Sequence, residues 1–226
     1  MRSTSPDGPL PALLLVLTGV TGLVDAVSYL KLGHVFVANM TGNVVFLGFA
    51  VADAADFSIP ASLLAIAAFM GGALVGGRIG SSAGHHRARL LAITTYLQIA
   101  LVGAALVVSM VGAFVQYSLI ALLALAMGLQ NATARRLGVP DLTTTVLTMT
   151  LTGLAADSTL AGGKNPHPGR RLQATAVMFL GAAVGAFLVF HVGVIAVLAL
   201  AFALLVLNGI ASYRFRSSSE AWTVGA

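Results

Sequence analysis

Hydrophobic residues fill this chain in long runs separated by short polar stretches. A helix needs about 20 residues to cross the roughly 30 Å hydrocarbon core of a bilayer, so uncharged runs of that length are typical of membrane spans. Eight candidate runs lie at residues 10–30, 34–52, 59–79, 91–112, 114–134, 139–161, 172–190 and 192–212. The pattern predicts an all-α membrane protein with one integral membrane domain over 1–226, and short polar tails at 1–9 and 214–226.

Composition supports this fold class and excludes several functions. Hydrophobic residues make up 58% of the chain and charged residues 8%, against about 25% charged residues in soluble proteins. The chain contains no cysteine, which excludes disulfides, thiolate metal sites and cysteine nucleophiles. The net charge of +5 comes from basic residues scattered through short loops. Such loops indicate membrane orientation and not nucleic-acid binding.

The two halves of the chain resemble each other in three places that follow the same order. Residues 22–26 (GLVDA) match 128–132 (GLQNA), 36–41 (FVANMT) lie opposite the threonine-rich stretch 140–153, and 72–77 (GALVGG) match 181–186 (GAAVGA). The matches indicate pseudo-repeats over about 10–112 and 114–212. Arg2, the following apolar run and Ala26 could also form a cleaved signal peptide, but cleavage there would discard part of the first repeat.

Lysine and arginine positions predict how the chain crosses the membrane. If all eight runs crossed, the basic residues would divide six against six, although short cytoplasmic loops normally carry a clear excess. If runs 34–52 and 139–161 instead return to the side they entered from, the division is eleven against one, with only Lys31 outside. This model predicts six crossings, two broken or re-entrant segments, cytoplasmic termini and an inverted repeat.

A second model gives the same count. If only 139–161 returns to the side it entered from, the chain has seven crossings and an outside N-terminus, and Arg2 takes the place of Lys31 as the one basic residue outside. The pseudo-symmetry of the two halves favours the model in which both segments return. An irregular segment at membrane depth must lie inside the protein or against water, since lipid cannot satisfy its backbone. Both segments carry polar residues that suit such a place.

Segment 34–52 is interrupted by Asn39, Thr41, Gly42 and Asn43. Glycine lowers helix propensity and Thr41 or Asn43 could cap a helix, so we expect a break followed by a half-helix from about Val44. The amides of that half-helix could then face a substrate, as in transporters with discontinuous helices. Alternatively, the asparagines only hydrogen-bond neighbouring helices and fix their packing.

The expected counterparts in the second half are Asn131, Asp141, Thr144, Thr145 and Thr148. Asn131 is the neutral repeat mate of Asp25, which lies inside the first apolar run. A carboxylate at that depth is costly and usually faces the protein interior, so Asp25 is a candidate carrier of a proton or cation. It could instead lie near the membrane interface, cap the start of the second segment or be held by buried amides.

Other residues have simpler interpretations. The glycines at positions 72, 76, 80, 181 and 185 have the spacing of closely packed helices. The stretch 84–90 (GHHRARL) is expected to be a cytoplasmic loop beside anionic lipid. Gln98, Gln130 and Tyr29 are possible polar lining. The sequence has no motif for a metal, a cofactor or a catalytic nucleophile, so we expect neither a cofactor nor an enzyme.

The stretches 22–48 and 128–157 together resemble the YoaK family of small bacterial integral membrane proteins. The resemblance extends over about 10–212, and Asp25, Phe36, Asn39, Thr41, Gly42 and Asn43 stand where the family pattern places them. It implies the bacterial inner membrane as the location. It implies no substrate, because the family is a domain of unknown function.

The sequence favours a transporter that moves a small solute or ion by alternating access, with Asp25 as the carrier of a coupling proton or cation. Its partners would be the lipid bilayer and that solute, with assembly into a homo-oligomer left open. A passive channel is one alternative. A scaffold or accessory subunit, whose buried polar residues only hold helices together, is the other.

Overall fold

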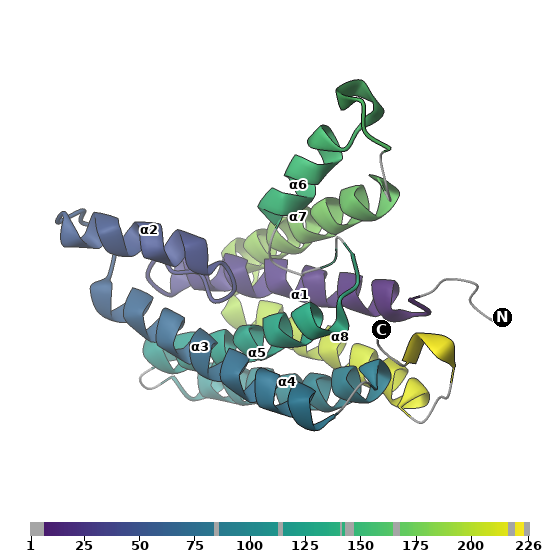
Figure 1. The fold of residues 1–226 in the computed structure, drawn as a ribbon. Coiled ribbons are helices and arrows are strands. Elements are labelled where there is room, and N and C mark those ends of the chain that lie inside the picture. The colour runs from purple at the N-terminus through teal and green to yellow at the C-terminus, as the bar shows by residue number, and fades with distance from the viewer. Residues whose placement is uncertain are drawn as a thin grey trace.

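The computed structural model describes residues 7–83, 86–112, 115–140, 142, 147–164, 168–216 and 220–223. They form eight α-helices and two 3-10 turns, and contain no β-strand (Figure 1). The helices are α1 (Leu10–Lys31), α2 (Met40–Val51), α3 (Ile59–Ser82), α4 (Arg87–Val111), α5 (Val115–Leu137), α6 (Leu147–Ala156), α7 (Pro168–His191) and α8 (Val194–Phe215), and the turns are η1 (Thr159–Ala161) and η2 (Ala221–Thr223). The predicted all-α class is confirmed.

Six helices are long and apolar enough to cross a bilayer, and two are not. The helices α1, α3, α4, α5, α7 and α8 have 22 to 25 residues, which corresponds to at least about 33 Å at 1.5 Å per residue. The other two have 12 residues in α2 and 10 in α6, or about 18 and 15 Å. Neither short helix can cross a core of about 30 Å alone. The fold is therefore that of a multi-pass membrane protein.

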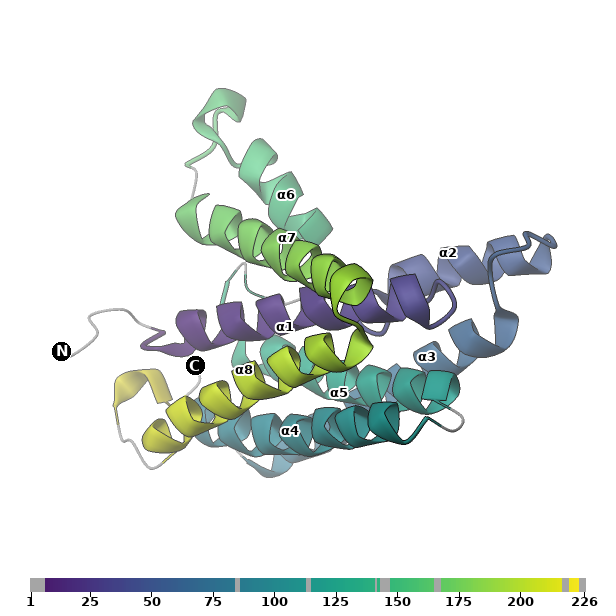
Figure 2. The same ribbon diagram turned by 180° about the vertical axis from the view of Figure 1, so that it is seen from behind.

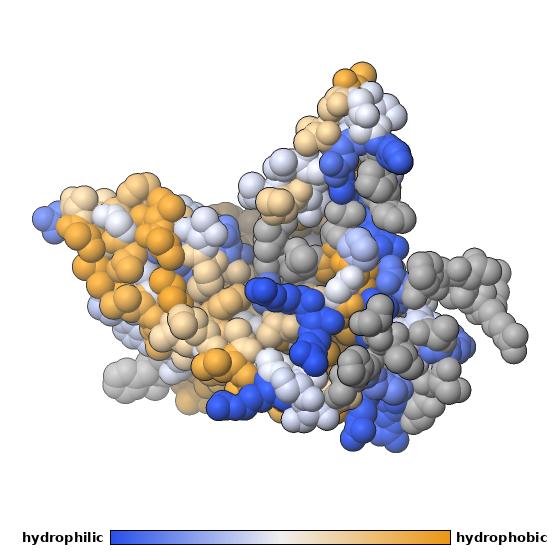
Figure 3. Space-filling view, viewed as in Figure 1, coloured by the Kyte–Doolittle hydropathy of each residue, from blue (hydrophilic) through white to orange (hydrophobic). Residues whose placement is uncertain are grey.

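The outer surface of the helices is largely apolar, as a lipid-facing surface must be. Many large hydrophobic side chains are exposed on α2, α3 and α7, among them Val51, Met70, Leu74, Phe179 and Phe190. In Figure 3 the hydrophobic colour covers α2 and α3, whereas hydrophilic residues gather toward the end where α1 starts. In water such a surface would drive aggregation, so the burial pattern fits a bilayer.

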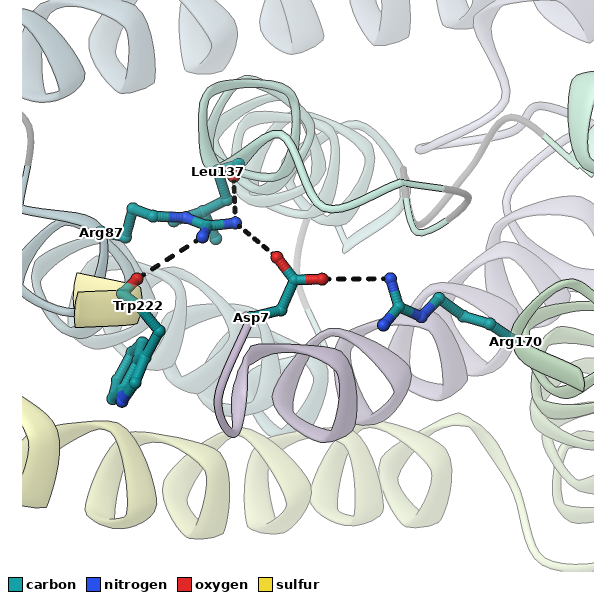
Figure 4. Close-up of polar contacts among 5 residues, drawn as sticks. All are labelled: Asp7, Arg87, Leu137, Arg170 and Trp222. Atoms are coloured by element: carbon teal, nitrogen blue, oxygen red, sulfur yellow. Dashed lines mark hydrogen bonds and ion pairs between the residues drawn. The ribbon is translucent and has the colours of Figure 1, made fainter. Parts of the chain in front are cut away.

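Several chain segments meet at that end of the bundle, which we call the basic end. The start of α1 and the end of α8 lie together there in both views (Figures 1 and 2). Asp7 pairs with Arg87 at the start of α4 and with Arg170 in the first turn of α7, and Arg87 also donates to the carbonyl oxygen of Leu137 at the end of α5 (Figure 4). Because α5 ends and α7 begins at the basic end, the segment between them, with α6, leaves and returns on one side.

The first short helix returns in the same way at the opposite end, which we call the Lys31 end. The backbone after α1 turns at His34, whose ring nitrogen lies 3.1 Å from the carbonyl oxygen of Asp56, just before α3. Gln116, at the start of α5, donates to the carbonyl oxygen of Leu32 at 3.0 Å. The segment that contains α2 therefore leaves and returns at the Lys31 end.

Two helix pairs are packed so closely that glycine is required at their contacts. A Cβ added at Gly72 of α3 would strike the carbonyl oxygen of Leu125 in α5, and one at Gly128 of α5 would strike that of Phe69 in α3. In the pair α1 and α7, a Cβ at Gly22 would lie 2.6 Å from the backbone nitrogen of Ala182. The prediction that the glycine stripes mark close packing is confirmed.

A buried hydrogen-bond chain joins three helices near the middle of the bundle. Gln98 of α4 donates to Gln130 of α5 at 2.7 Å, and Gln130 donates to Thr21 of α1 at 2.8 Å. Both glutamines are 1% exposed. The interpretation of Gln98 and Gln130 as polar lining is therefore wrong, because their amides are used in helix packing.

We predict that Gly72→Ala destabilises the protein by about 1–3 kcal/mol, because the added methyl group has no room beside the α5 backbone. Gly77→Ala is the matched control, since no atom lies within 4 Å of a Cβ built there. The measurement is the thermal midpoint of each purified variant in detergent. Equal midpoints for the two variants would contradict the packing described here.

Candidate functional site

The segment between α1 and α2 is non-helical and runs back into the bundle, where a carboxylate holds its backbone. Oδ1 of Asp25 accepts hydrogen bonds from the backbone nitrogens of Val37 at 3.1 Å and Ala38 at 2.9 Å. Asp25 is only 5% exposed. Asp25 is therefore held by buried amides, as one of the interpretations of the sequence expected. Oδ2 takes no part in these two bonds.

Asn43 holds the backbone of Phe36, the residue that precedes Val37 and Ala38. Its Oδ1 accepts from the backbone nitrogen of Phe36 at 2.8 Å, and its Nδ2 donates to the carbonyl oxygen of Phe36 at 2.6 Å. The side chain thus pairs with Phe36 as a neighbouring strand would. Asn43 is fully buried, so it supports the backbone and is not the central polar contact expected from the sequence.

The start of α2 also differs from the expectation. The helix begins at Met40 with Asn39 as its N-cap, and no side chain caps it. The predicted half-helix after a break is present, but its predicted start near Val44 is wrong, because Thr41, Gly42 and Asn43 lie in its first turn. Glycine at position 42 lets the ring of Phe36 pack closely against the α2 backbone, since a Cβ there would lie 2.7 Å from that ring.

A cavity of about 480 Å³ opens at the start of α2. Its polar lining comes from four of the predicted site residues, namely Asn39, Thr41, Asn131 and Thr148. Gly42 lines it as well, and Phe69 of α3 contributes an apolar wall. The structure therefore brings together side chains from α2, α5 and α6 that are far apart in the sequence.

A second cavity of about 380 Å³ adjoins the first. Asp25 and Tyr29 of α1 line it, together with Ala182 of α7. Asn39 and Thr148 line both cavities, so the two share a boundary. Figure 3 shows the surface hollowed between α2 on the left and α6 on the right.

Both short helices begin at this pair of cavities. Met40, the first residue of α2, lines the first cavity, and Leu147, the first residue of α6, lines the second. The first turn of a helix has backbone N–H groups without partners inside the helix. Those of α2 thus lie where polar groups of a bound molecule could accept their hydrogen bonds.

The repeat mates Asp25 and Asn131 contribute differently. Asp25 lines the second cavity, and Asn131, which is half-buried and donates to the carbonyl oxygen of Met127 at 2.9 Å, lines the first. Three further predicted residues, Asp141, Thr144 and Thr145, lie outside the described residues. The described part of the chain contains no group of three or more His, Asp or Glu side chains that could hold a metal ion.

Sequence reasoning missed the contacts that hold α6 in place. Arg171 of α7 pairs with Asp157 beyond the end of α6 at 2.8 Å. Gly153 of α6 leaves room for this guanidinium, because a Cβ there would lie 2.8 Å from Arg171. In the sequence, the only local sign of this contact is that Gly153 lies four residues before Asp157.

A different device holds α2. Aromatic rings stack in a row from Tyr29 of α1 through Phe36 and Phe46 to Phe57, with centroid distances of 5.0, 5.6 and 4.9 Å. Such pairs contribute about 0.5–1.5 kcal/mol each beyond the area they bury. The row ties the non-helical segment, α2 and the loop before α3 into one unit beside the second cavity.

Comparisons with known proteins agree with this fold. Residues 13–211 match the model of a family described as "Protein of unknown function (DUF1275)". The chain is 37% identical over 151 residues to the UPF0700 transmembrane protein YoaK of Bacillus subtilis (strain 168), a match that covers 64% of this chain and 65% of that protein. No solved structure shows a significant match. The predicted resemblance to the YoaK family is confirmed.

We predict that Asn43→Ala makes the backbone amides of residues 36–38 exchange with deuterium about 10- to 100-fold faster. Removing the side chain leaves buried backbone groups of Phe36 without partners, at a cost of about 1–3 kcal/mol. Asn39→Ala is the matched control, because the Asn39 side chain is exposed and caps nothing. Equal exchange in both variants would rule out the bracing role of Asn43.

Proposed function

Because the chain belongs to the DUF1275 family of membrane proteins, we propose that it is a carrier that moves a small polar solute or ion by alternating access. The solute would bind between the starts of α2 and α6. The family description names no substrate, so the proposal rests on the site itself.

One observation carries the proposal: two adjoining cavities that share polar lining lie in a six-span bundle, and its two short helices meet at them. Polar side chains are costly within a membrane and usually mark a solute or ion pathway. Discontinuous helices that begin at a central site are a recurring feature of secondary transporters, where their free amides contact the substrate.

The packing of the two halves supports an inverted repeat. Exchanging α1–α4 with α5–α8 relates the pair α1 and α7 to the pair α5 and α3, and relates the contact of α2 with α3 to that of α6 with α7. The helices α4 and α8 are mates of each other and pack together, so the exchange maps this pair onto itself. The glycine contacts follow the same exchange, since Gly22 and Gly128 are repeat mates and both lie in close helix pairs. In this proposal, the closely packed pairs move as rigid bodies around the site.

Asp25 is the candidate for coupling transport to a proton or cation. It is the acidic residue that lines the second cavity, and its Oδ2 is not used by the bonds to Val37 and Ala38. The same bonds favour the alternative that the protein is a scaffold or accessory subunit, in which Asp25 only holds the backbone of its neighbours. The two functions differ in whether the charge of Asp25 is needed.

The proposed location is the bacterial inner membrane, with the basic end and both termini in the cytoplasm. Every described lysine and arginine except Lys31 lies in a helix end or loop of the basic end, and short cytoplasmic loops carry such an excess. This orientation is tested by single cysteines introduced at Ser58 and at Lys164. They mark the two ends of the bundle in the thiol-labelling experiment described below.

We predict that Asp25→Asn abolishes solute accumulation driven by a pH gradient and leaves the fold intact. The Oδ1 of asparagine can still accept from Val37 and Ala38, so the substitution removes the charge and keeps the bonds. The measurement is a solute screen in proteoliposomes with and without a pH gradient. The matched control is Asp53→Asn, in an exposed loop position where φ is +61° and asparagine is well tolerated.

Unchanged accumulation in Asp25→Asn would contradict coupling through this residue. A failure of wild type to move any solute in the screen, together with loss of stability in Asp25→Ala but not Asp25→Asn, would support the scaffold instead.

A further inference from the structure

A cluster of charges at the basic end joins elements that move apart in the proposed mechanism. Asp7 lies between two arginines, with Oδ1 3.2 Å from Arg87 and Oδ2 3.2 Å from Arg170 (Figure 4). The side chains are 13%, 14% and 18% exposed, respectively. One carboxylate thus connects the starts of α1, α4 and α7.

Arg87 extends this cluster to two further elements. The same nitrogen that contacts Asp7 donates to the carbonyl oxygen of Leu137, at 2.7 Å, and its other terminal nitrogen lies 3.5 Å from the carbonyl oxygen of Trp222 in η2 (Figure 4). The contact with Leu137 satisfies a carbonyl at the end of α5 that has no partner within the helix. Arg87 therefore links the end of α5 to the start of α1.

Three of the helices that the cluster joins, α1, α5 and α7, also wall the two cavities. The second cavity lies against α1 and α7, and the first lies against α5 through Asn131. Asp25 is 15 residues beyond the start of α1 at Leu10, or about 22 Å along the helix, so the cluster is remote from the solute. In the proposed mechanism, a path from the basic end to the cavities opens when the end of α5 separates from the starts of α1 and α7.

A contact nearer the middle of the bundle would stay in place during that separation. The bond from Gln130 to Thr21 joins α5 to α1 at 2.8 Å and is fully buried. Each of the helices α1 and α5 is packed far more extensively against its glycine partner than against the other. The pairs can therefore rotate about Gln130 and Thr21 while their ends part.

We propose that Asp7, Arg87 and Arg170 form a latch that holds the basic end of the solute pathway closed, and that opening requires Arg87 to release Asp7 or Leu137. The proposal rests on the proposed transport function and adds its regulation. A half-buried ion pair suits a reversible closure, because its charges regain water when they separate. An apolar seal of similar size would have no such compensation.

The test uses Thr148→Cys as a reporter, because Thr148 lines both cavities and the chain has no native cysteine. A membrane-impermeant thiol reagent is applied to right-side-out and to inverted vesicles. Ser58→Cys and Lys164→Cys, each in a separate protein, mark the Lys31 end and the basic end. The labelling rate from the basic side is compared among latch variants.

We expect Asp7→Asn and Arg87→Gln to raise labelling of the reporter from the basic side by about tenfold or more, the effect of losing one charged hydrogen bond. Arg89→Gln is the matched control, since Arg89 is exposed on the same helix two residues away. Arg87→Lys keeps the charge but loses the planar fork, so an intermediate rate is expected. Gel filtration shows which variants remain folded.

Labelling from the basic side at the wild-type rate in the folded latch variants, or an equal rise in Arg89→Gln, would overturn the latch. If Asp7→Asn and Arg87→Gln fail to fold, labelling of the reporter in Arg87→Lys at the wild-type rate would likewise overturn the latch. A reporter that labels from neither side in any variant would instead contradict the water-accessible site on which the transport proposal depends. The two failures are thus distinguishable.

Discussion

The structure depends on satisfying a non-helical backbone inside a membrane protein. Within lipid, an unpaired N–H or C=O group costs several kcal/mol, and the segment between α1 and α2 has such groups at Phe36, Val37 and Ala38. Asp25 and Asn43 supply their partners. Because of this bracing, α2 can begin in the interior, and its first turn can face a cavity instead of the bilayer surface.

Glycine packing and the basic-end cluster build the rest of the site around that segment. Close contacts between α1 and α7 and between α3 and α5 leave two compact pairs, and the cavities lie where α2 and α6 meet them. The short helices are attached by different means, α2 by stacked aromatic rings and α6 by the pair Arg171 and Asp157. The two halves thus have the same arrangement of helices, but different interactions hold their short helices in place.

Much of the fold was predictable because membrane spans have a strong, local signal. Helix lengths, the two short segments and the glycine contacts all follow from hydropathy and spacing. The convergence of Asn39, Thr41, Asn131 and Thr148 followed from the internal repeat. The part played by Asn43 did not, since it depends on the irregular conformation of Phe36, seven residues earlier.

The pairing of charges far apart along the chain could not be predicted from the sequence either. Asp7 is 80 residues from Arg87 and 163 from Arg170, and no periodic pattern connects them. The expectation that Arg87 belongs to a lipid-facing loop was therefore wrong, because the side chain is half-buried in the cluster at the basic end.

The central claim is that α2 and α6 begin at one shared polar site, and cross-linking tests it most directly. In a protein carrying Asn39→Cys and Thr148→Cys, a short bis-maleimide should join the two residues within one chain, as detected by mass spectrometry of the linked peptides. Asn39→Cys with Leu160→Cys is the control, since Leu160 is 99% exposed beyond the far end of α6. Linkage of the first pair alone is the predicted result. Linkage of the control pair without the first would contradict the shared site.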